Sequence, residues 1–344
     1  MDSVRVIVEP GTGYELLLSG MIVAARQAER SLDEAVVWRR RAEAAGPEVF
    51  EGLRRIGREP FINLLGFVHA MTEEPTARAA LAALTDAPER DVLLALVGYH
   101  RRAMRLVTPP AVIRAAVDGD ENARREFRRT SFPELRYWQA SLRYLLSGPA
   151  AEIRDAVAGT INAWYERGFA EHESGIRETV TADAAAVRDL VAAMELDAVL
   201  ERIAPGIQFA REVGQSLVVL VPDMIIRPGY VIGDHGPTLL IAYPAGASRA
   251  DPDVPPDGLV RLGKALGDPL RLRALRELRD GPLTLTDLAE RLGVPRTSLQ
   301  HHVRILMYAG LVTLSVDDAQ WGRLELRDDA LAQVSRIAER YVLG

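Results

Sequence analysis

The sequence predicts a mainly helical α+β protein in which small antiparallel sheets accompany the helices, and three observations support this fold class. Apolar residues recur at helical spacing over most of residues 14–200. Short β-branched and aromatic runs, typical of strands, follow within residues 216–243 and again within 311–326. Between these regions, residues 246–257 are rich in Pro and Asp and lack apolar periodicity, as in an exposed linker.

The chain is therefore expected to form two domains. We predict an α+β N-terminal domain at residues 1–245, a linker at 246–257 and a C-terminal domain at 258–344. The N-terminal domain begins with a strand at 4–9 and a helix at 14–26. Its further helices are predicted at about 32–44, 47–56, 60–71, 75–84, 89–104, 110–117, 121–129, 133–146, 150–173 and 182–200.

Short apolar runs after these helices predict the sheet that closes the helical body. Pro-Asp, Pro-Gly and Gly-rich turns separate the runs, which suggests three or four antiparallel strands in a meander. The strand at 4–9 is a candidate to join them. The runs lie at 216–221, 224–226, 230–232 and 238–243.

Composition excludes several classes of function. Hydrophobic residues make up 48% of the 344 residues and charged residues 26%, which suits a globular protein with a real core. The absence of cysteine excludes disulfides, thiolate metal sites and cysteine nucleophiles. No apolar run approaches the ~18 residues of a membrane span, and residues 1–5 lack a signal-peptide pattern. We expect no membrane association and a cytoplasmic location.

Charge is distributed unevenly along the chain. The formal net charge of −6 argues by itself against a nucleic-acid-binding protein. Residues 258–344, however, carry 13 Arg or Lys against 11 Asp or Glu, and residues 258–304 carry nine against five. Net charges of +2 and +4 fit a small DNA-binding module attached to a larger domain that does not bind DNA.

Local signals fix the first helices of the C-terminal domain. Apolar residues share one face of a helix that starts near Leu259, and Asp268 is placed to cap a second helix. Thr284 and Asp287 have the spacing of a capping box, which predicts a third helix. A tight turn at 293–295 leads into a fourth.

The remaining elements complete a winged helix-turn-helix. Gly310 ends the fourth helix, residues 296–309, in a left-handed conformation. Residues 311–316 and 321–326 predict a hairpin, and residues 328–342 predict a last amphipathic helix. The order helix, helix, helix-turn-helix, wing, helix is that of a DNA-binding winged helix.

The fourth helix has two faces of different chemistry. At ~100° per residue, Leu299, Val303 and Leu306 cluster and are expected to face the core. The opposite side carries no acidic residue, and its groups can hydrogen-bond base edges and phosphates in a major groove. This face holds Thr297, Gln300, His301, Arg304 and Tyr308, with Arg296 and Ser298 in the first turn.

Four spaced segments of this domain resemble the winged helix of the ArsR (arsenical-resistance repressor) family. The segments are 266–275, 285–293, 298–306 and 309–312, and the matching region covers about a quarter of the chain. The resemblance implies a transcriptional repressor that binds a palindromic operator in double-stranded DNA as a homodimer. It places DNA contacts at or beside Arg296, Thr297, Ser298, Gln300, His301 and Arg304, with Trp321 and Arg323 in the wing.

The chain departs from that family in three respects. Metal-sensing members carry cysteines in the third helix, whereas this chain has none, so thiolate sensing of a metal is excluded. Asp317 and Asp318 at the hairpin tip would repel phosphate and weaken a wing contact. The long N-terminal domain is an addition, expected to sense a small-molecule effector or to stabilise the dimer.

Two alternatives stay open: an enzyme with an appended winged helix, or a protein-interaction adaptor. An enzyme needs a catalytic constellation in residues 1–245, and we identify none there, nor a cofactor or metal site. The glycine turn at 9–13 lacks the third glycine of a dinucleotide loop, since Leu16 stands there. His172 lacks the second histidine of a zinc-protease motif, and the six histidines set no geometry.

Three further residues of the C-terminal domain have competing interpretations. Arg271 could form a structural ion pair or contact a phosphate. His302 lies near the apolar face of its helix, which favours packing. Because adjacent helical residues point ~100° apart, His301 and His302 are not expected to chelate a metal.

Overall fold

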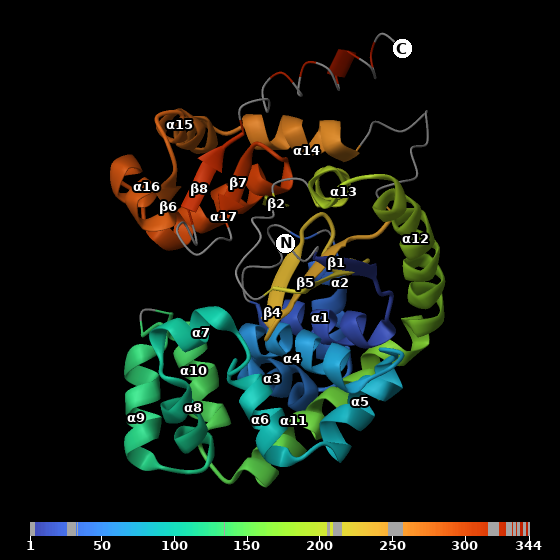
Figure 1. Cartoon of the computed structure of the whole chain (residues 1–344), viewed down its shortest axis with the longest axis vertical. Coiled ribbons are helices and arrows are strands. Elements are labelled where there is room, and N and C mark those ends of the chain that lie inside the picture. The colour runs from blue at the N-terminus through green and yellow to red at the C-terminus, as the bar shows by residue number, and fades with distance from the viewer. Residues whose placement is uncertain are drawn as a thin grey trace. The chain divides into compact units, whose positions relative to one another are not determined.

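The computed structural model of the chain is mainly helical with two small four-stranded sheets, which confirms the predicted fold class (Figure 1). It describes residues 4–25, 32, 34–133, 135–204, 207–208, 215–246, 257–315 and 323–327, and singly 332, 335, 338, 339 and 342. Among them, no helix combines the length and the apolar character that a membrane span requires.

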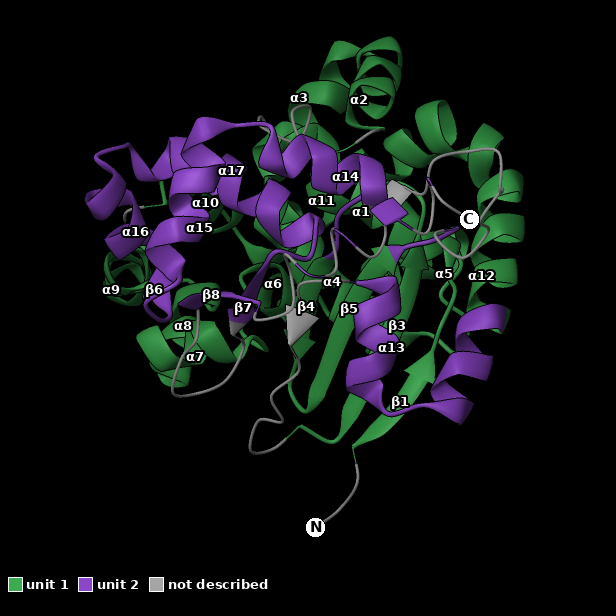
Figure 2. Cartoon of the chain, turned by 90° about the horizontal axis from the view of Figure 1, so that it is seen from above, with its two compact units in different colours: residues 1–185, 215–227, 231–243 green, residues 186–214, 228–230, 244–344 purple. Residues whose placement is uncertain are grey.

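The chain folds into two compact units (Figure 2). Unit 1 comprises residues 1–185, 215–227 and 231–243, and unit 2 comprises 186–214, 228–230 and 244–344. The sequence predicts one linker, at 246–257, whereas each of the two units consists of three separate segments of the chain. Unit 2 thus includes segments that precede this linker.

The helices of unit 1 surround a central pair. α1 (Thr12–Ala24) is buried at every position from Thr12 to Val23, and α4 (Arg58–Met71) is buried from Pro60 to Val68. A Cβ on Gly20 would lie 2.7 Å from the ring of Phe61, so glycine is what lets these helices approach closely. The remaining helices are α2 (Ala35–Ala44), α3 (Pro47–Ile56), α5 (Ala77–Asp86), α6 (Glu89–Leu96), α7 (Arg102–Val107), α8 (Pro110–Val117), α9 (Glu121–Thr130), α10 (Arg136–Leu145) and α11 (Ala150–Trp164).

Three predicted helices of this region differ most from the structure in their bounds. The helix expected at 89–104 is broken into α6 and α7, because Gly98 between them adopts φ +77°. The helix expected to start at 182 is instead part of α12 (Glu173–Ala193). The helix expected at 150–173 ends with α11 at Trp164, and a π-helical turn (Tyr165–Phe169) and a 3-10 turn (Ala170–His172) join α11 to α12.

The sheet of unit 1 is mixed rather than a meander. Its strands are β1 (Arg5–Val8), β3 (Leu217–Asp223), β4 (Val231–His235) and β5 (Thr238–Pro244), in the order β1-β3-β5-β4. β1 joins the sheet parallel to β3, and β5 lies between β3 and its sequence neighbour β4.

The run at 224–226 is not a strand. The Oδ1 atom of Asp223 accepts hydrogen bonds from the amides of both Ile225 and Ile226, at 2.8 Å each. An aspartate that binds its following amides forms a turn and removes donors that a strand would need. Apolar, β-branched composition therefore predicts burial here but not extension.

Unit 2 contains the winged helix. Its elements are α13 (Leu196–Ile203), β2 (Ile207–Gln208), α14 (Asp257–Leu266), α15 (Pro269–Leu278), β6 (Leu283–Thr284), α16 (Leu285–Leu292), α17 (Arg296–Tyr308), β7 (Val312–Ser315) and β8 (Arg323–Leu326). Its sheet has the order β2-β7-β8-β6, and β7 and β8 form the predicted antiparallel hairpin. β2 was not predicted, and it pairs in parallel with β7. The hairpin tip with Trp321, Asp317 and Asp318, and most of the predicted last helix, lie outside the described residues.

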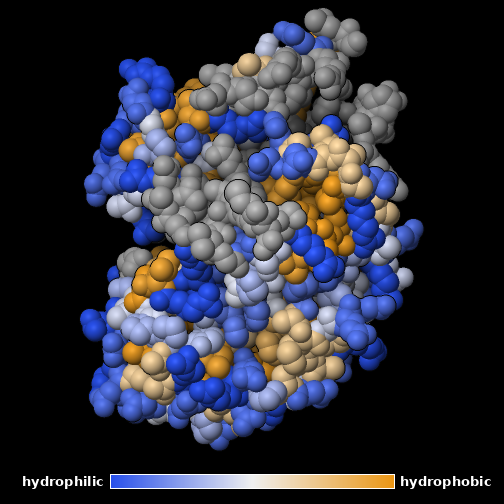
Figure 3. Space-filling model, viewed as in Figure 1, coloured by the Kyte–Doolittle hydropathy of each residue, from blue (hydrophilic) through white to orange (hydrophobic). Residues whose placement is uncertain are grey.

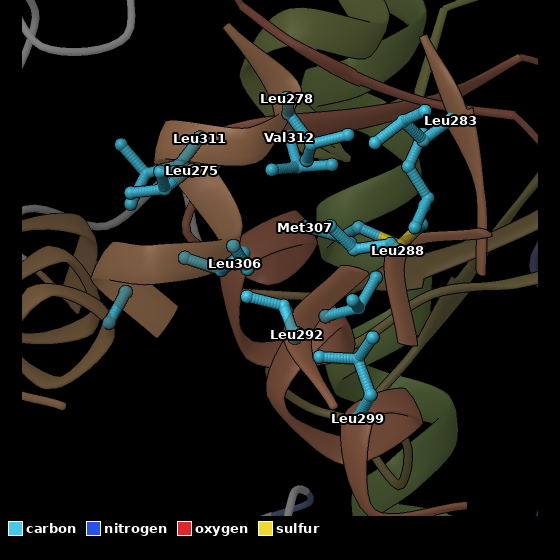
Figure 4. Close-up of a cluster of buried hydrophobic side chains, with 14 of the residues drawn as sticks. Leu275, Leu278, Leu283, Leu288, Leu292, Leu299, Leu306, Met307, Leu311 and Val312 are labelled. Carbon is cyan, nitrogen blue, oxygen red and sulfur yellow. The ribbon is translucent and has the colours of Figure 1, made fainter. Parts of the chain in front are cut away.

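One apolar core holds the winged helix together. Figure 4 shows side chains from α15, α16, α17 and the start of the hairpin directed toward one another. Leu288, Leu299, Leu306, Leu311 and Val312 are fully buried in it. Burying a leucine side chain contributes about 1.5–3 kcal/mol, so this core fixes where α17 lies relative to α16.

Candidate nucleic-acid interface

The helix-turn-helix is built by local hydrogen bonds that the sequence specifies. The Oγ1 atom of Thr284 accepts from the amide of Asp287 (3.1 Å), and the Asp287 carboxylate accepts from the amide of Thr284 (3.4 Å). This capping box starts α16, as predicted. Gly293 ends α16 in the left-handed conformation (φ 67°, ψ 34°), which turns the chain into α17.

A polar network connects α14, α15 and α17. Asp268 caps α15 by accepting from the amides of Leu270 (2.9 Å) and Arg271 (3.0 Å). The Arg271 guanidinium donates to the carbonyls of Lys264 (2.6 Å) and Ala265 (2.8 Å), and its side chain is only 11% exposed. Arg271 therefore satisfies the C-terminal carbonyls of α14, which supports the structural interpretation over the phosphate contact.

His302 also belongs to this network. Its Nδ1 atom lies 3.6 Å from Asp268 Oδ1 and 3.4 Å from Arg271 Nη1. Burial opposes ionisation of Asp268, but the Arg271 amide and the charges of Arg271 and His302 outweigh it and lower the pKa of this carboxyl. His302 was expected to pack within the fold, and it does so through polar contacts with Asp268 and Arg271.

The apolar face of α17 is buried as predicted, whereas of the predicted exposed face only Thr297 is fully exposed. Leu299, Val303 and Leu306 are buried in the core, whereas Arg296, Thr297 and Ser298 of the first turn are exposed. Gln300, His301 and Arg304 are half-buried. No acidic residue lies anywhere on α17.

Tyr308, at the end of the predicted exposed face, packs against another aromatic ring. It is half-buried, and its ring meets that of Tyr230 edge-on, with centroids 5.5 Å apart. Burial raises the pKa of Tyr230 well above its usual value. Tyr230 packs against the winged-helix core, from residues that the sequence assigned to the N-terminal sheet.

The base of the wing carries one of the predicted contact residues. Arg323 opens β8 opposite Thr284, is exposed, and donates to the carbonyl of Pro282 (3.2 Å). Arg327 follows β8 and pairs with Glu201 of α13 at 2.8 Å. α13 and β2 thus attach a segment from before the linker to the wing.

In unit 1, the fold brings together histidine side chains that lie far apart in the sequence. The rings of His100 and His235 stack with centroids 4.0 Å apart, and His69 lies 2.9 Å from Glu9. Burial, followed by the charges of His100 and His69, lowers the pKa of His235 to about 4. These residues are far apart in sequence, so no spacing could have indicated the group. Within the described part of the chain, no group of His, Cys, Asp or Glu could hold a metal ion.

A second group in unit 1 is a fully buried pair of carboxyls, Glu15 of α1 and Asp223 of β3. Glu15 accepts from the amide of Met224 (2.8 Å). Burial raises the pKa of Glu15 well above its usual value, and the neighbouring charge of Asp223 raises it further. Burial also raises the pKa of Asp223. Because two neighbouring buried carboxylates repel each other, this environment favours the protonated form of Glu15.

Comparison with known proteins places the helix-turn-helix among transcriptional regulators. Residues 266–315 match the family described as "Helix-turn-helix domain". The HTH-type transcriptional regulator NmtR of Mycobacterium tuberculosis is 47% identical over 49 residues, which are 14% of this chain and 41% of that protein. The HTH-type transcriptional regulator CmtR of Mycobacterium bovis is 40% identical over 75 residues, 22% of this chain and 63% of that protein.

These similarities are confined to the winged helix. The chain spans about two fifths of one relative and three fifths of the other. No solved structure was found to match the chain. The C-terminal region is a winged helix-turn-helix related to those of HTH-type transcriptional regulators, as the sequence predicted.

Proposed function

We propose that the chain is a cytoplasmic, homodimeric transcriptional repressor that reads a palindromic operator in double-stranded DNA with α17. The observation that carries this proposal is the exposed, acid-free first turn of α17, held by the core of a helix-turn-helix. An ordinary solvated helix mixes both signs of charge. A helix that displays only hydroxyl, amide, imidazole and guanidinium groups suits a major groove.

The residues of α17 divide into two roles. Gln300 and Arg304 carry the amide and guanidinium groups that form bidentate hydrogen bonds to adenine and guanine edges. Arg296, Thr297 and Ser298 bind phosphates near the start of the helix. Pro295 provides no side-chain cap there, and the Ser298 amide donates to the Pro295 carbonyl (3.0 Å), so the amides of Arg296 and Thr297 are the ones available to the same phosphates.

Two further residues complete the proposed DNA contacts. His301, beside Gln300 on α17, donates to a base edge or a phosphate. Arg323, exposed at the base of the wing, contacts the DNA backbone. Both act from positions that the winged-helix core holds.

Unit 1 is proposed to control this binding. An effector that binds one dimer geometry better than the other would shift the population toward or away from the DNA-binding form. Among the aromatic residues that could line an apolar pocket, Trp138, Trp164 and Phe169 are fully buried. These three side chains therefore contribute first to the hydrophobic core of unit 1.

The test is a titration of the full chain with a duplex from the promoter region of its own gene. Gln300→Ala combined with Arg304→Ala is expected to abolish the preference for this duplex over an unrelated one of equal length. The matched control is Arg279→Ala, an exposed arginine whose partner is Asp280 on the same chain segment. If the wild type binds no DNA even at low salt, the winged helix is an interaction module and the proposal is wrong.

A further inference from the structure

A second basic surface lies in unit 1, on α7, α9 and α10. Residues 101–145 contain ten arginines and five acidic residues, a net charge of +5. Because the whole chain carries −6, the rest of it carries −11. This segment is therefore more basic than residues 258–304 of the winged helix, which carry +4.

The acidic residues of the segment do not neutralise the surface. Three of them lie at the start of α9 and already have partners. Asp118 pairs with Arg90 (2.6 Å), Asp120 accepts from a backbone amide of α9 (2.6 Å), and Glu121 pairs with Arg124 (2.9 Å). Most of the negative charge thus lies near the start of α9, while Glu126 is exposed in its second half and Glu134 lies outside the described residues.

The other end of α9 and the whole of α10 are different. The side chains of their arginines form no hydrogen bond or ion pair with any residue that the structure describes. α10 contains neither Asp nor Glu. These arginines are Arg128 and Arg129 of α9 and Arg136 and Arg143 of α10, joined by Arg105 of α7.

Two contacts bring the three helices together at this point. The hydroxyls of Thr108 and Thr130 lie 2.7 Å apart, which holds the end of α7 against the end of α9. The Gln139 side-chain amide donates to the carbonyl of Ser131 (2.8 Å), which fastens the first turn of α10 to the end of α9. The arginines of all three helices lie within about one turn of these contacts.

The exposed face of α10 combines arginine with aromatic rings. Arg136, Tyr137 and Arg143 are exposed, and Tyr137 retains 46% of its surface. Arg136 and Arg143 are two turns apart, about 10 Å along one side of the helix. The Arg55 guanidinium lies 5.8 Å from the centroid of the Tyr144 ring and extends the surface onto α3. In Figure 3, hydrophilic residues cover most of α7–α9, with smaller hydrophobic areas between them.

We propose that this α9–α10 surface binds the phosphate backbone of double-stranded DNA without reading its sequence. Clustered like charges without counter-charges repel one another, and an anionic ligand removes that cost. Arginine interleaved with aromatic residues is typical of nucleic-acid surfaces. The face lacks the free amide groups that discriminate bases, because Gln139 is used within the fold. The inference rests on the proposed function, which supplies the same DNA to the same chain.

The test compares the salt dependence of DNA binding by the full chain and by Arg136→Ala/Arg143→Ala. The probes are the promoter duplex and an unrelated duplex of equal length. Each lost phosphate contact reduces the slope of log K against log salt by about 0.9, so the double variant should lose about 2 from the slope. Affinity for both duplexes should fall by the same factor, and Arg136→Lys/Arg143→Lys should restore the slope. Arg40→Ala, an exposed arginine of α2, is the control.

The outcomes separate this inference from the proposed function. A preference for the promoter duplex with an unchanged slope in the double variant would overturn the inference and leave the function intact. A wild type that binds both duplexes equally, with a slope that falls in the double variant, would support the inference against the sequence-reading function. A wild type that binds neither duplex overturns both.

Discussion

Two helices of the chain, α17 and α10, each carry arginines and no acidic residue, but they differ in the side chains that accompany the arginines. α17 adds Thr297, Ser298 and Gln300, whose hydroxyl and amide groups can distinguish base pairs. α10 adds Tyr137 and Tyr144, whose rings carry no such donor and acceptor pattern. Charge determines whether a surface attracts DNA, and neutral polar groups determine whether it discriminates between sequences.

The two helices also rest on different supports. α17 belongs to the core of the small winged helix, whereas α10 packs against α3 and α4 in the larger unit. At the α3–α4 junction, Gly57 approaches Ser141 of α10 so closely that a Cβ would lie 2.0 Å from its hydroxyl. A core substitution that loosens α17 should therefore reduce sequence-specific DNA binding directly, whereas one that loosens α10 should not.

The largest expected effect tests this difference in support. Leu306→Ala in α17 and Leu142→Ala in α10 each remove a fully buried side chain and should cost about 2–5 kcal/mol of local stability. Amide hydrogen exchange of α17 and α10 measures each cost in its own unit. Only Leu306→Ala should abolish the preference for the promoter duplex. Leu306→Met, which conserves volume, should cost less than about 1.5 kcal/mol. Loss of the preference in Leu142→Ala would contradict the separation.

The next effect concerns sequence discrimination. Gln300→Ala should reduce the difference in binding free energy between the promoter duplex and an unrelated duplex by about 1–3 kcal/mol, because a bidentate base contact is lost. Arg143→Ala should leave that difference unchanged while both affinities fall. Competition titrations at one salt concentration measure both quantities. An equal loss of discrimination in the two variants would mean that α10 also reads sequence.

One carboxyl of unit 1, Glu15, and one of the winged helix, Asp268, should respond to pH in opposite directions. Glu15 has a raised pKa in the folded chain, so its contribution to stability is present below its ordinary pKa of 4.5 and is lost as pH rises through the folded value. Glu15→Gln removes this loss. The variant should gain stability relative to the wild type as pH rises above about 4.5. Tryptophan fluorescence during urea unfolding reports the effect, since Trp38, Trp138 and Trp164 lie in unit 1.

His235, in the histidine group of unit 1, also titrates. The effect of Glu15 must therefore be measured as the difference in stability between Glu15→Gln and the wild type. The lowered pKa of His235 has the opposite sign: its contribution is present above 6.5 and is lost as pH falls toward about 4. The wild-type profile therefore contains both effects. Glu126→Gln, an exposed carboxyl on α9, is the control. A Glu15→Gln difference that stays constant from pH 4.5 to 8 would show that Glu15 is not protonated in the folded chain.

Sequence predicts the winged helix well because its determinants are local. The capping box of Thr284 and Asp287, the left-handed Gly293 and the apolar spacing of α17 each act within a few residues. The histidine group and the Glu15–Asp223 pair depend on tertiary packing between distant segments, so no periodicity indicates them. The strand order of unit 1 was missed for the same reason. The arginines at the end of α9 and on α10 were visible in the sequence, but only the fold shows that their side chains have no ion-pair partner among the described residues.

The smallest expected effect concerns Asp268, which caps the N-terminus of α15 and also carries a negative charge. Asp268→Ala should cost about 1 kcal/mol of winged-helix stability, whereas Asp268→Asn keeps an acceptor and should cost less. Because the pKa of Asp268 is lowered, its charge contributes above its ordinary 3.8 and the contribution is lost as pH falls through the folded value, opposite to Glu15. Hydrogen exchange of α15 and α17 between pH 3 and 6 measures this. If Asn proves as costly as Ala, the interactions of the charge with Arg271 and His302 outweigh the cap, and Arg271→Ala should then be equally destabilising.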